Sequence, residues 1–110
     1  MSNKYNARKT TVNGITFHSK KEAERYLYLL SEEQQGNITD LECQPRFLLT
    51  EAFEYQGQHI RPTYYYADFR YKKDGRVIVE DVKGVKTQVF RLKEKLFKKI
   101  YNDIDFRIVK

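Results

Sequence analysis

The stretch from Arg76 to Gly84, with the sequence RVIVEDVKG, constrains the fold of this chain most strongly. Its β-branched apolar run predicts a strand that is buried on both faces. Because residues two apart share a face of a strand, Asp81 and Lys83 point the same way, and Glu80 points into the opposite layer. Charges at the end of a buried strand cost desolvation energy unless they are paired or hold a metal. We therefore interpret this strand end, followed by a glycine that leaves space beside the charges, as the candidate active centre.

The length of 110 residues favours one domain spanning 1–110, with residues 1–11 as a basic N-terminal arm. The formal net charge of +6 favours an anionic partner, with nucleic acid ahead of an anionic membrane. The alternative stays open, because many soluble domains are equally basic and bind nothing. Cys43 is the single cysteine, so a disulfide or a cysteine zinc site within the chain is excluded, which fits a reducing cytosol. We find no membrane-spanning apolar run and no signal-peptide pattern, so we expect a soluble intracellular protein.

Local patterns predict an α/β (α+β) fold in which a mixed central sheet is flanked by helices. Ser19-Lys20-Lys21-Glu22 forms a capping box that opens the first helix, and Thr87 caps the second. Asn13-Gly14 and Lys73-Asp74-Gly75 are turn signals, and the latter leads into the central strand. The order of the main elements is αβββαβ. The predicted ranges are a hairpin or extended lead-in at 11–17, a helix to about 35, a connector or short strand at 38–44, strands at 47–55, 60–72 and from 76, a helix at 88–101 and a strand at 105–109.

Two predictions concern which side chains share a face. Alternation along the strand at 60–72 places one set of residues together on one side, namely Tyr65, Ala67, Phe69 and Tyr71, and the other set opposite them, namely Tyr64, Tyr66, Asp68 and Arg70. Helical spacing assigns the core face of the second helix to Val89, Leu92, Lys93, Leu96 and Ile100, with Phe90 and Phe97 beside it. The same spacing predicts an exposed basic ridge of Arg91, Lys95 and Lys98.

Three carboxylates are expected to converge. A tight hairpin centred near Asp74-Gly75 places Asp68 almost opposite Asp81. Like charges in that position repel each other, and a divalent cation would resolve the repulsion. Glu22 lies on the border of the apolar stripe of the first helix, so it can face the sheet. Carboxylate oxygens are the ligands that Mg²⁺ prefers, so the pattern predicts a magnesium site.

Such a site supports phosphodiester hydrolysis. The metal acts as a Lewis acid and lowers the pKa of a bound water, while Lys83 positions that water and offsets charge on the phosphate. Simpler interpretations remain for each residue: Glu22 as a helix cap, Asp81 and Lys83 as an exposed pair at a fraying strand end, and Asp68 as a solvated strand end. The joint arrangement favours the functional interpretation.

The residues of this site resemble a known signature. Tyr66-Ala67-Asp68-Phe69 followed by Val79-Glu80-Asp81-Val82-Lys83-Gly84 resembles the motif of the PD-(D/E)XK nuclease superfamily. The segment Phe17-His18-Ser19-Lys20-Lys21-Glu22 is similar to the acidic opening of that superfamily's first helix. Nearly the whole chain, from Asn3 to the last strand, resembles a small family of phage and prophage proteins. That family is assigned to the superfamily, near the Holliday-junction resolvases and the transposase endonuclease subunit TnsA.

The resemblance implies a role for each residue of the cluster. Asp68 corresponds to the first motif acid, Asp81 to the second and Lys83 to the motif lysine. Glu22 corresponds to the helix carboxylate, and the backbone carbonyl of Val82 would complete the metal shell. Mg²⁺ is the implied cofactor, with Mn²⁺ able to substitute.

This sequence departs from the motif at two positions, and an alternative function remains. Ala67 replaces the motif proline, and the second acid is Asp rather than Glu. The implied activity is a Mg²⁺-dependent endonuclease acting on branched or structured DNA during phage replication or recombination, in the cytoplasm of a bacterial host. Cutting both strands of a junction would call for a homodimer. The alternative is a non-catalytic nucleic-acid-binding module with a degenerate nuclease fold. The candidate contacts to the DNA backbone are Lys4, Arg8, Lys9, Lys86, Arg91 and Lys95.

Overall fold

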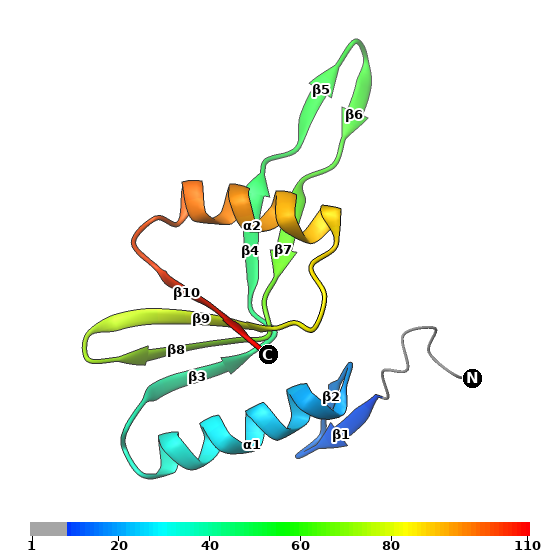
Figure 1. Cartoon of the computed structure of the whole chain (residues 1–110). Coiled ribbons are helices and arrows are strands. Elements are labelled where there is room, and N and C mark those ends of the chain that lie inside the picture. Colours follow the sequence, from blue (N-terminus) through cyan, green and yellow to red (C-terminus); the bar gives the residue numbers. More distant parts are fainter. Residues whose placement is uncertain (1–8) are drawn as a thin grey trace.

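A four-stranded mixed sheet in the order β10-β9-β8-β3 forms the centre of the fold (Figure 1). The predicted central strand is β9 (Arg76–Val82), which runs antiparallel to β8 (Phe69–Lys73) and parallel to β10 (Asp105–Val109). The other edge is β3 (Thr39–Cys43), antiparallel to β8. The computed structural model of the chain describes residues 9–110.

Two helices flank this sheet. α1 (Lys20–Gln34) begins after Ser19 and α2 (Gln88–Ile100) begins after Thr87, and each cap hydroxyl accepts a backbone hydrogen bond from the first turn of its helix. Counting these helices and the strands of the central sheet, the chain order is helix, three strands, helix, strand. The mixed α+β class is therefore confirmed, and the order matches the predicted one with β3 in place of the strand predicted at 47–55. No helix within residues 9–110 is long and apolar enough to cross a membrane.

The core is divided into two clusters, one on each side of the sheet. Ile78 belongs to the α1 cluster and Val79 to the α2 cluster, which explains why β9 is apolar at successive positions. The α1 cluster also contains Phe17, Ala23, Tyr26, Leu29, Ile38, Phe69 and Tyr71. The α2 cluster also contains Phe47, Leu49, Tyr65, Ala67, Phe90 and Phe97.

The segment between α1 and β9 is one long, bent hairpin. Its outgoing strands are β3, β4 (Arg46–Thr50) and β5 (Phe53–Tyr55), and its returning strands are β6 (Gln58–Ile60), β7 (Thr63–Tyr66) and β8. β4 pairs with β7 and β5 with β6, each antiparallel. The strands predicted at 47–55 and 60–72 are therefore both interrupted. A separate small hairpin, β1 (Thr10–Val12) and β2 (Ile15–Phe17), turns at Asn13-Gly14 as predicted.

The bend in the long hairpin reverses which side of the sheet its residues face. On one strand it lies at Gln44, where φ is 56°, and on the other at Asp68. Before the bend Tyr65 packs in the α2 cluster, and after it Phe69 packs in the α1 cluster. The prediction of one shared face for the residues at 65, 67, 69 and 71 is therefore wrong, although all four are buried.

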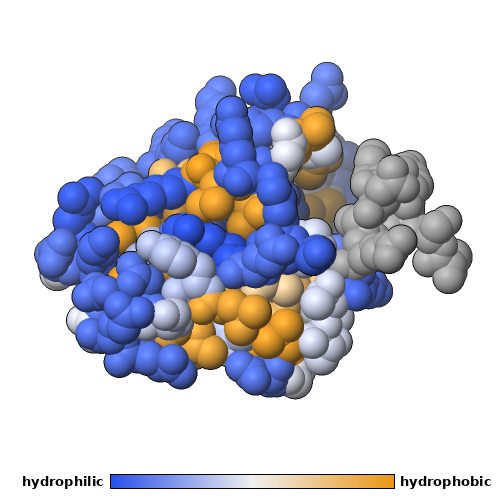
Figure 2. Space-filling view, turned by 60° about the horizontal axis from the view of Figure 1, so that its bottom comes forward, coloured by the Kyte–Doolittle hydropathy of each residue, from blue (hydrophilic) through white to orange (hydrophobic). Residues whose placement is uncertain are grey.

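The predicted core face of α2 is wrong for Val89, Leu92 and Ile100, whereas Leu96 packs partly against the α2 cluster. Val89 and Leu92 are 65% and 59% exposed, whereas Phe90 and Phe97 are buried. The Phe97 ring packs edge-on against Phe47, with the centroids 4.9 Å apart. Aromatic rings bury more apolar area than valine or leucine, so the aromatic side of the helix packs against the sheet. Figure 2, with the α1 side turned forward, shows a mainly hydrophilic face interrupted by hydrophobic patches.

Candidate functional site

Asp68 lies at the bend between β7 and β8, where both its backbone N–H and its backbone carbonyl form hydrogen bonds. Its N–H donates to the carbonyl of Glu80 at 3.1 Å, and its carbonyl accepts from Gln44 at 2.8 Å. Its side-chain Oδ2 accepts from the Val82 N–H at 2.6 Å. The paired register of β8 on β9 ends at Phe69 opposite Glu80, so Asp68 and Asp81 are the next residues along the two segments and lie near each other, as the turn geometry predicted. The contact that the structure shows at Val82 is through its amide, so the metal role of its carbonyl stays a prediction.

Glu22 reaches Asp68 from the first turn of α1. The two carboxyl groups are joined by a hydrogen bond, which requires one of them to carry a proton. Burial raises the pKa of Asp68 to about 9, and the hydrogen bond to Glu22 and the charge of Asp81 act in the same direction. Glu22 therefore faces the sheet as predicted, and the raised pKa of Asp68 favours the protonated form of that residue while no cation is bound.

Asp81 is buried in β9 between a hydroxyl and an ammonium group. Its Oδ2 accepts a hydrogen bond from Tyr65, and the Nζ atom of Lys83 lies 3.3 Å from its Oδ1. Burial raises the pKa of Asp81, although Tyr65 and Lys83 oppose the increase. Burial and the charge of Asp81 raise the pKa of Tyr65, so this hydroxyl remains a hydrogen-bond donor. Lys83 also lies over the ring of Phe90, 4.8 Å from its centroid, and this contact fixes the direction of the amine.

The donor atoms of the cluster fit a hard divalent cation. Glu22 Oε2 is buried without a hydrogen-bond partner among the described residues, and Asp81 Oδ1 is buried with only the ion pair to Lys83 beside it. An unsatisfied buried carboxylate oxygen is costly, and Mg²⁺ or Mn²⁺ would remove that cost. Within residues 9–110, no three acidic, imidazole or thiol groups already surround one point as a formed metal site. Glu22, Asp68 and Asp81 therefore lie near one another without forming a ready coordination shell.

A second buried charge, Glu80, lies on the other face of β9 as predicted, but its partners were not found in the sequence. Glu80 is fully buried, and both of its carboxylate oxygens accept from Arg25, each at 2.7 Å. The hydroxyl of Tyr71 donates to the same carboxylate. Arg25 follows Glu22 by three residues, so both project from one side of α1. That spacing was the available signal, and the ion pair fixes α1 against the strand that bears Asp81.

The predicted DNA-contacting residues lie in different parts of the molecule. Lys4 and Arg8 lie outside the described residues. Lys9 is exposed just before β1, while Arg91 and Lys95 are exposed on α2 as predicted. The cations of α2 therefore form one candidate surface, and Lys9 belongs to another part of the molecule (Figure 1).

Lys86, the remaining candidate, is engaged within the molecule. Its Nζ atom lies 3.4 Å from both carboxylate oxygens of Glu94, a largely buried residue of α2. Glu94 also pairs with Lys98 at 3.3 Å. The pairing of Glu94 with Lys86 and Lys98 was not predicted, although the spacing of Glu94 and Lys98 is typical of a helical ion pair. These two lysines therefore neutralise a buried charge as well as contributing to the basic surface.

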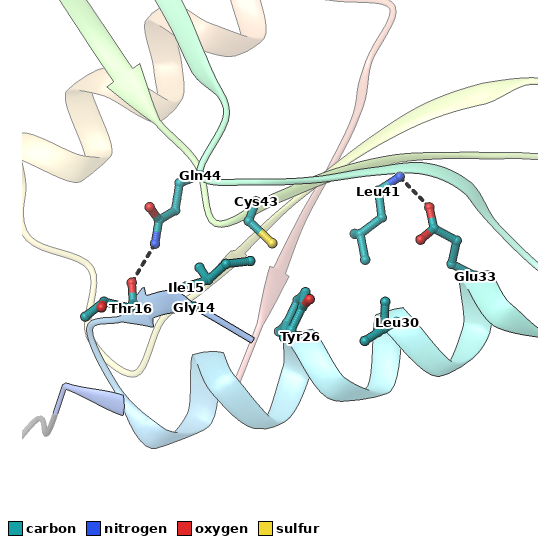
Figure 3. Close-up of a pocket in the computed structure, with 9 residues that line it drawn as sticks. All are labelled: Gly14, Ile15, Thr16, Tyr26, Leu30, Glu33, Leu41, Cys43 and Gln44. Carbon is teal, nitrogen blue, oxygen red and sulfur yellow. Dashed lines mark hydrogen bonds between the residues drawn. The ribbon is translucent and has the colours of Figure 1, made fainter. Parts of the chain in front are cut away.

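A pocket of about 630 Å³ lies apart from the acidic cluster, among α1, β3 and the β1–β2 hairpin (Figure 3). Tyr26 and Leu30 of α1 and Cys43 of β3 line it. At its edge the side chain of Gln44 donates to the carbonyl of Thr16 at 3.0 Å. Its lining contains none of the predicted catalytic residues. The candidate site is therefore the carboxylate cluster and not this pocket.

Residues 2–110 match the family model described as Protein of unknown function (DUF1064), and the chain belongs to this family. No curated protein matches the chain. The family model spans nearly the whole sequence but assigns no function, so the proposed activity depends on the geometry of the cluster.

Proposed function

We propose that this DUF1064 protein is a Mg²⁺-dependent endonuclease that hydrolyses phosphodiester bonds in branched or structured DNA. The observation that supports this proposal is the convergence of Glu22, Asp68 and Asp81, which come from three separate segments. Lys83 Nζ lies 3.3 Å from one of these carboxylates. Gathering like charges in a buried place costs free energy, and titratable groups held in that way are typical of functional sites.

In such a reaction the carboxylates would bind the metal and Lys83 would stabilise charge on the phosphate. Bound Mg²⁺ would polarise the phosphate and lower the pKa of a coordinated water. Glu22 offers a buried oxygen that has no hydrogen-bond partner among the described residues, and Asp81 offers a buried oxygen that is paired only with Lys83. Asp68 would be the third ligand, because a bound cation would favour its ionised form. Lys83 is directed by Asp81 and Phe90, so its ammonium group is fixed in place to offset charge developing on the phosphate.

The proposed substrate is recognised through its backbone. The net charge of +6 favours a polyanion, and Arg91 and Lys95 present exposed cations on α2. Phosphate contacts position DNA without reading its sequence, so we propose recognition by the shape of the DNA. The proposed setting is phage replication or recombination in the cytoplasm of a bacterial host.

The test is Mg²⁺-dependent cleavage of a labelled four-way DNA junction. Asp81→Asn removes a ligand charge while keeping the side-chain shape, and we expect it to lower the cleavage rate by at least about 100-fold. Asp103→Asn removes an exposed carboxylate and is the matched control, expected to cut like the parent. Equal cleavage by Asp81→Asn and the parent would overturn the catalytic assignment.

A second candidate function is non-catalytic binding of nucleic acid, which the exposed cations of α2 favour. It predicts that parent and Asp81→Asn bind the junction equally, with affinity that falls steeply as salt is raised, and that neither cuts. The buried carboxylate cluster weighs against it, because a protein that only binds phosphate has no use for three acids in one place.

A further inference from the structure

The β5–β6 hairpin projects from the body of the molecule as a two-stranded ribbon (Figure 1). Among the described strands, β5 and β6 pair only with each other. Gln56 and Gly57 close the ribbon with φ values of 47° and 78°, which is a tight hairpin turn. A lone two-stranded ribbon is marginally stable in water, so a ribbon with an apolar face gains stability from a partner.

The ribbon has one apolar face and one polar face. Phe53 lies opposite Ile60 in the register, and Tyr55 lies two residues further along on the same face as Phe53. Phe53 and Tyr55 are 53% and 50% exposed. On the other face, Glu54 and His59 are joined at 2.8 Å. The apolar face is therefore uncovered in the single chain.

α2 carries a second uncovered apolar surface, which we call the α2 stripe. It is separate from the buried side of the helix, and lysines lie on both of its edges at helical spacing. The α2 stripe consists of the exposed Val89, Leu92 and Ile100, with Leu96 between them partly buried against the α2 cluster, and the flanking lysines are Lys93 and Lys99.

We propose that the ribbon of one copy packs on the α2 stripe of a second copy, and that the exchange is reciprocal in a two-fold dimer. Within one copy, α2 packs on β4, the strand that leads into the ribbon. The Tyr101 hydroxyl, just after α2, donates to the carbonyl of Leu48 at 2.9 Å. The ribbon and the α2 stripe are therefore neighbouring surfaces, and one two-fold axis lets each copy cover both surfaces of the other.

The charges of the two surfaces are complementary. The ribbon and its base, residues 51–62, contain Glu51 and Glu54 against the single Arg61, so their charge is negative when His59 is neutral. The α2 stripe is bordered by lysines. Complementary charge of this kind sets partner and orientation more than it sets affinity.

DNA is the less suitable occupant of the ribbon. A two-stranded ribbon has a shape that enters a major groove, but proteins hold phosphates with cations. The two glutamates of this ribbon would repel them. The basic ridge at Arg91 and Lys95 lies on a different side of α2 from the stripe, so a dimer leaves those cations free for DNA.

The inference deepens the proposed nuclease, because two active sites are what cutting both strands of a junction needs. The association itself does not depend on that activity. The test is sedimentation equilibrium of the full chain, without DNA or Mg²⁺, over a wide range of concentration. We expect the parent to dimerise. A ribbon variant, Phe53→Ser with Tyr55→Ser, and a stripe variant, Val89→Ser with Leu92→Ser, should each raise the dimer Kd by roughly 100-fold.

Mixing the two variants distinguishes the proposed exchange from ribbon–ribbon or stripe–stripe contact. The stripe variant keeps an intact ribbon and the ribbon variant keeps an intact stripe, so one of the two contacts re-forms in the mixed dimer. We expect a Kd between those of the parent and of either variant alone. All substituted residues are exposed, and circular dichroism checks that each variant is folded. His59→Ala, on the polar face of the ribbon, is the matched control and should dimerise like the parent.

A parent that stays monomeric at every concentration would overturn the inference. So would a ribbon variant that dimerises normally but loses junction binding, because the ribbon would then be a DNA contact. A parent that dimerises but never cuts DNA would support the inference while refuting the proposed nuclease, so the two failures are distinguishable.

Discussion

Arg25 donates two hydrogen bonds of 2.7 Å to Glu80, joining the first helix to a carboxylate that has no exposed surface. The pair lies on the face of β9 opposite to the side chain of Asp81. Glu80 precedes Asp81 on β9, and Arg25 follows Glu22 by one helical turn. One ion pair therefore sets the position of the helix carboxylate relative to the strand carboxylate.

Removing one partner of this pair should destabilise the protein strongly. Arg25→Met leaves Glu80 buried without its counter-charge, and we expect the free energy of unfolding to fall by about 3–5 kcal/mol. Arg25→Lys keeps the charge but cannot form the two parallel bonds, so its loss should be smaller. Urea denaturation measures both, with Lys21→Met as a control on an exposed position of the same helix. If Arg25→Met unfolded at the parent's urea midpoint, the ion pair would not hold the helix.

The pairing can also be tested by removing both charges. Arg25→Met combined with Glu80→Leu replaces the ion pair by apolar side chains and should recover most of the stability lost in Arg25→Met. A double variant no more stable than the single one would show that the packing around Glu80 matters more than its charge.

The stability of the protein without a metal should fall as pH rises. The pKa of Asp68 is about 9 in the fold against an ordinary 3.8, so between these values the folded state holds a proton that the unfolded state has lost. The free energy of unfolding therefore decreases through this window. The neutral amide of Asp68→Asn can accept a hydrogen bond from Val82 and donate one to Glu22 without taking up a proton from solution. This variant should therefore raise the free energy of unfolding at pH 8 by about 1–2 kcal/mol. Thermal denaturation from pH 5 to about 9 measures the slope, which should flatten in this variant.

Magnesium should stabilise the folded chain. An ion that binds only the native state at about 100 times its Kd adds about 2.7 kcal/mol to the free energy of unfolding. We expect Mg²⁺ and Mn²⁺ to raise the Tm of the parent and to leave the Tm of Asp81→Asn nearly unchanged. Differential scanning calorimetry with and without each ion makes the comparison, and Ca²⁺ serves as a further oxygen-seeking cation. An equal rise in the parent and in Asp81→Asn would place the ion elsewhere.

Tyr65 should contribute to both stability and catalysis through its hydrogen bond to Asp81. Tyr65→Phe keeps the ring in the α2 cluster but leaves Asp81 Oδ2 without its donor, which should cost about 1–3 kcal/mol. Tyr64→Phe on the same strand, where the ring lies 4.3 Å from the Arg46 guanidinium, is the control and should be nearly neutral. Chemical denaturation and junction cleavage report on the two effects separately. Parent-like values for Tyr65→Phe in both assays would contradict the role given to its hydroxyl.

The local geometry of the acidic cluster was predictable, because short-range rules determine it. The turn at Asp74-Gly75 fixes the register of β8 on β9. Because side chains alternate between the two faces of a strand, Lys83 is then expected on the same face as Asp81. The capping box located Glu22 at the start of a helix. These rules require no knowledge of distant parts of the chain.

What the sequence did not reveal depends on contacts between distant segments. α2 has two apolar sides, and periodicity alone could not show that the one bearing Phe90 and Phe97 packs against Phe47. The bend at Gln44 and Asp68 interrupts alternation, so counting by twos across it assigned Phe69 to the wrong layer. The partnership of Arg25 with Glu80 spans 55 positions, beyond the reach of any helix or turn rule.

The bend at Asp68 joins the part of the long hairpin that belongs to the central sheet to the part that projects from it. On one side of it the long hairpin belongs to the central sheet, and on the other it leads out to the exposed tip at Gln56 and Gly57. Asp68 therefore lies at the point where the projecting part of the hairpin meets the central sheet. We therefore expect a molecule that docks on the tip to shift the backbone of this proposed metal ligand and so to change its affinity for the ion.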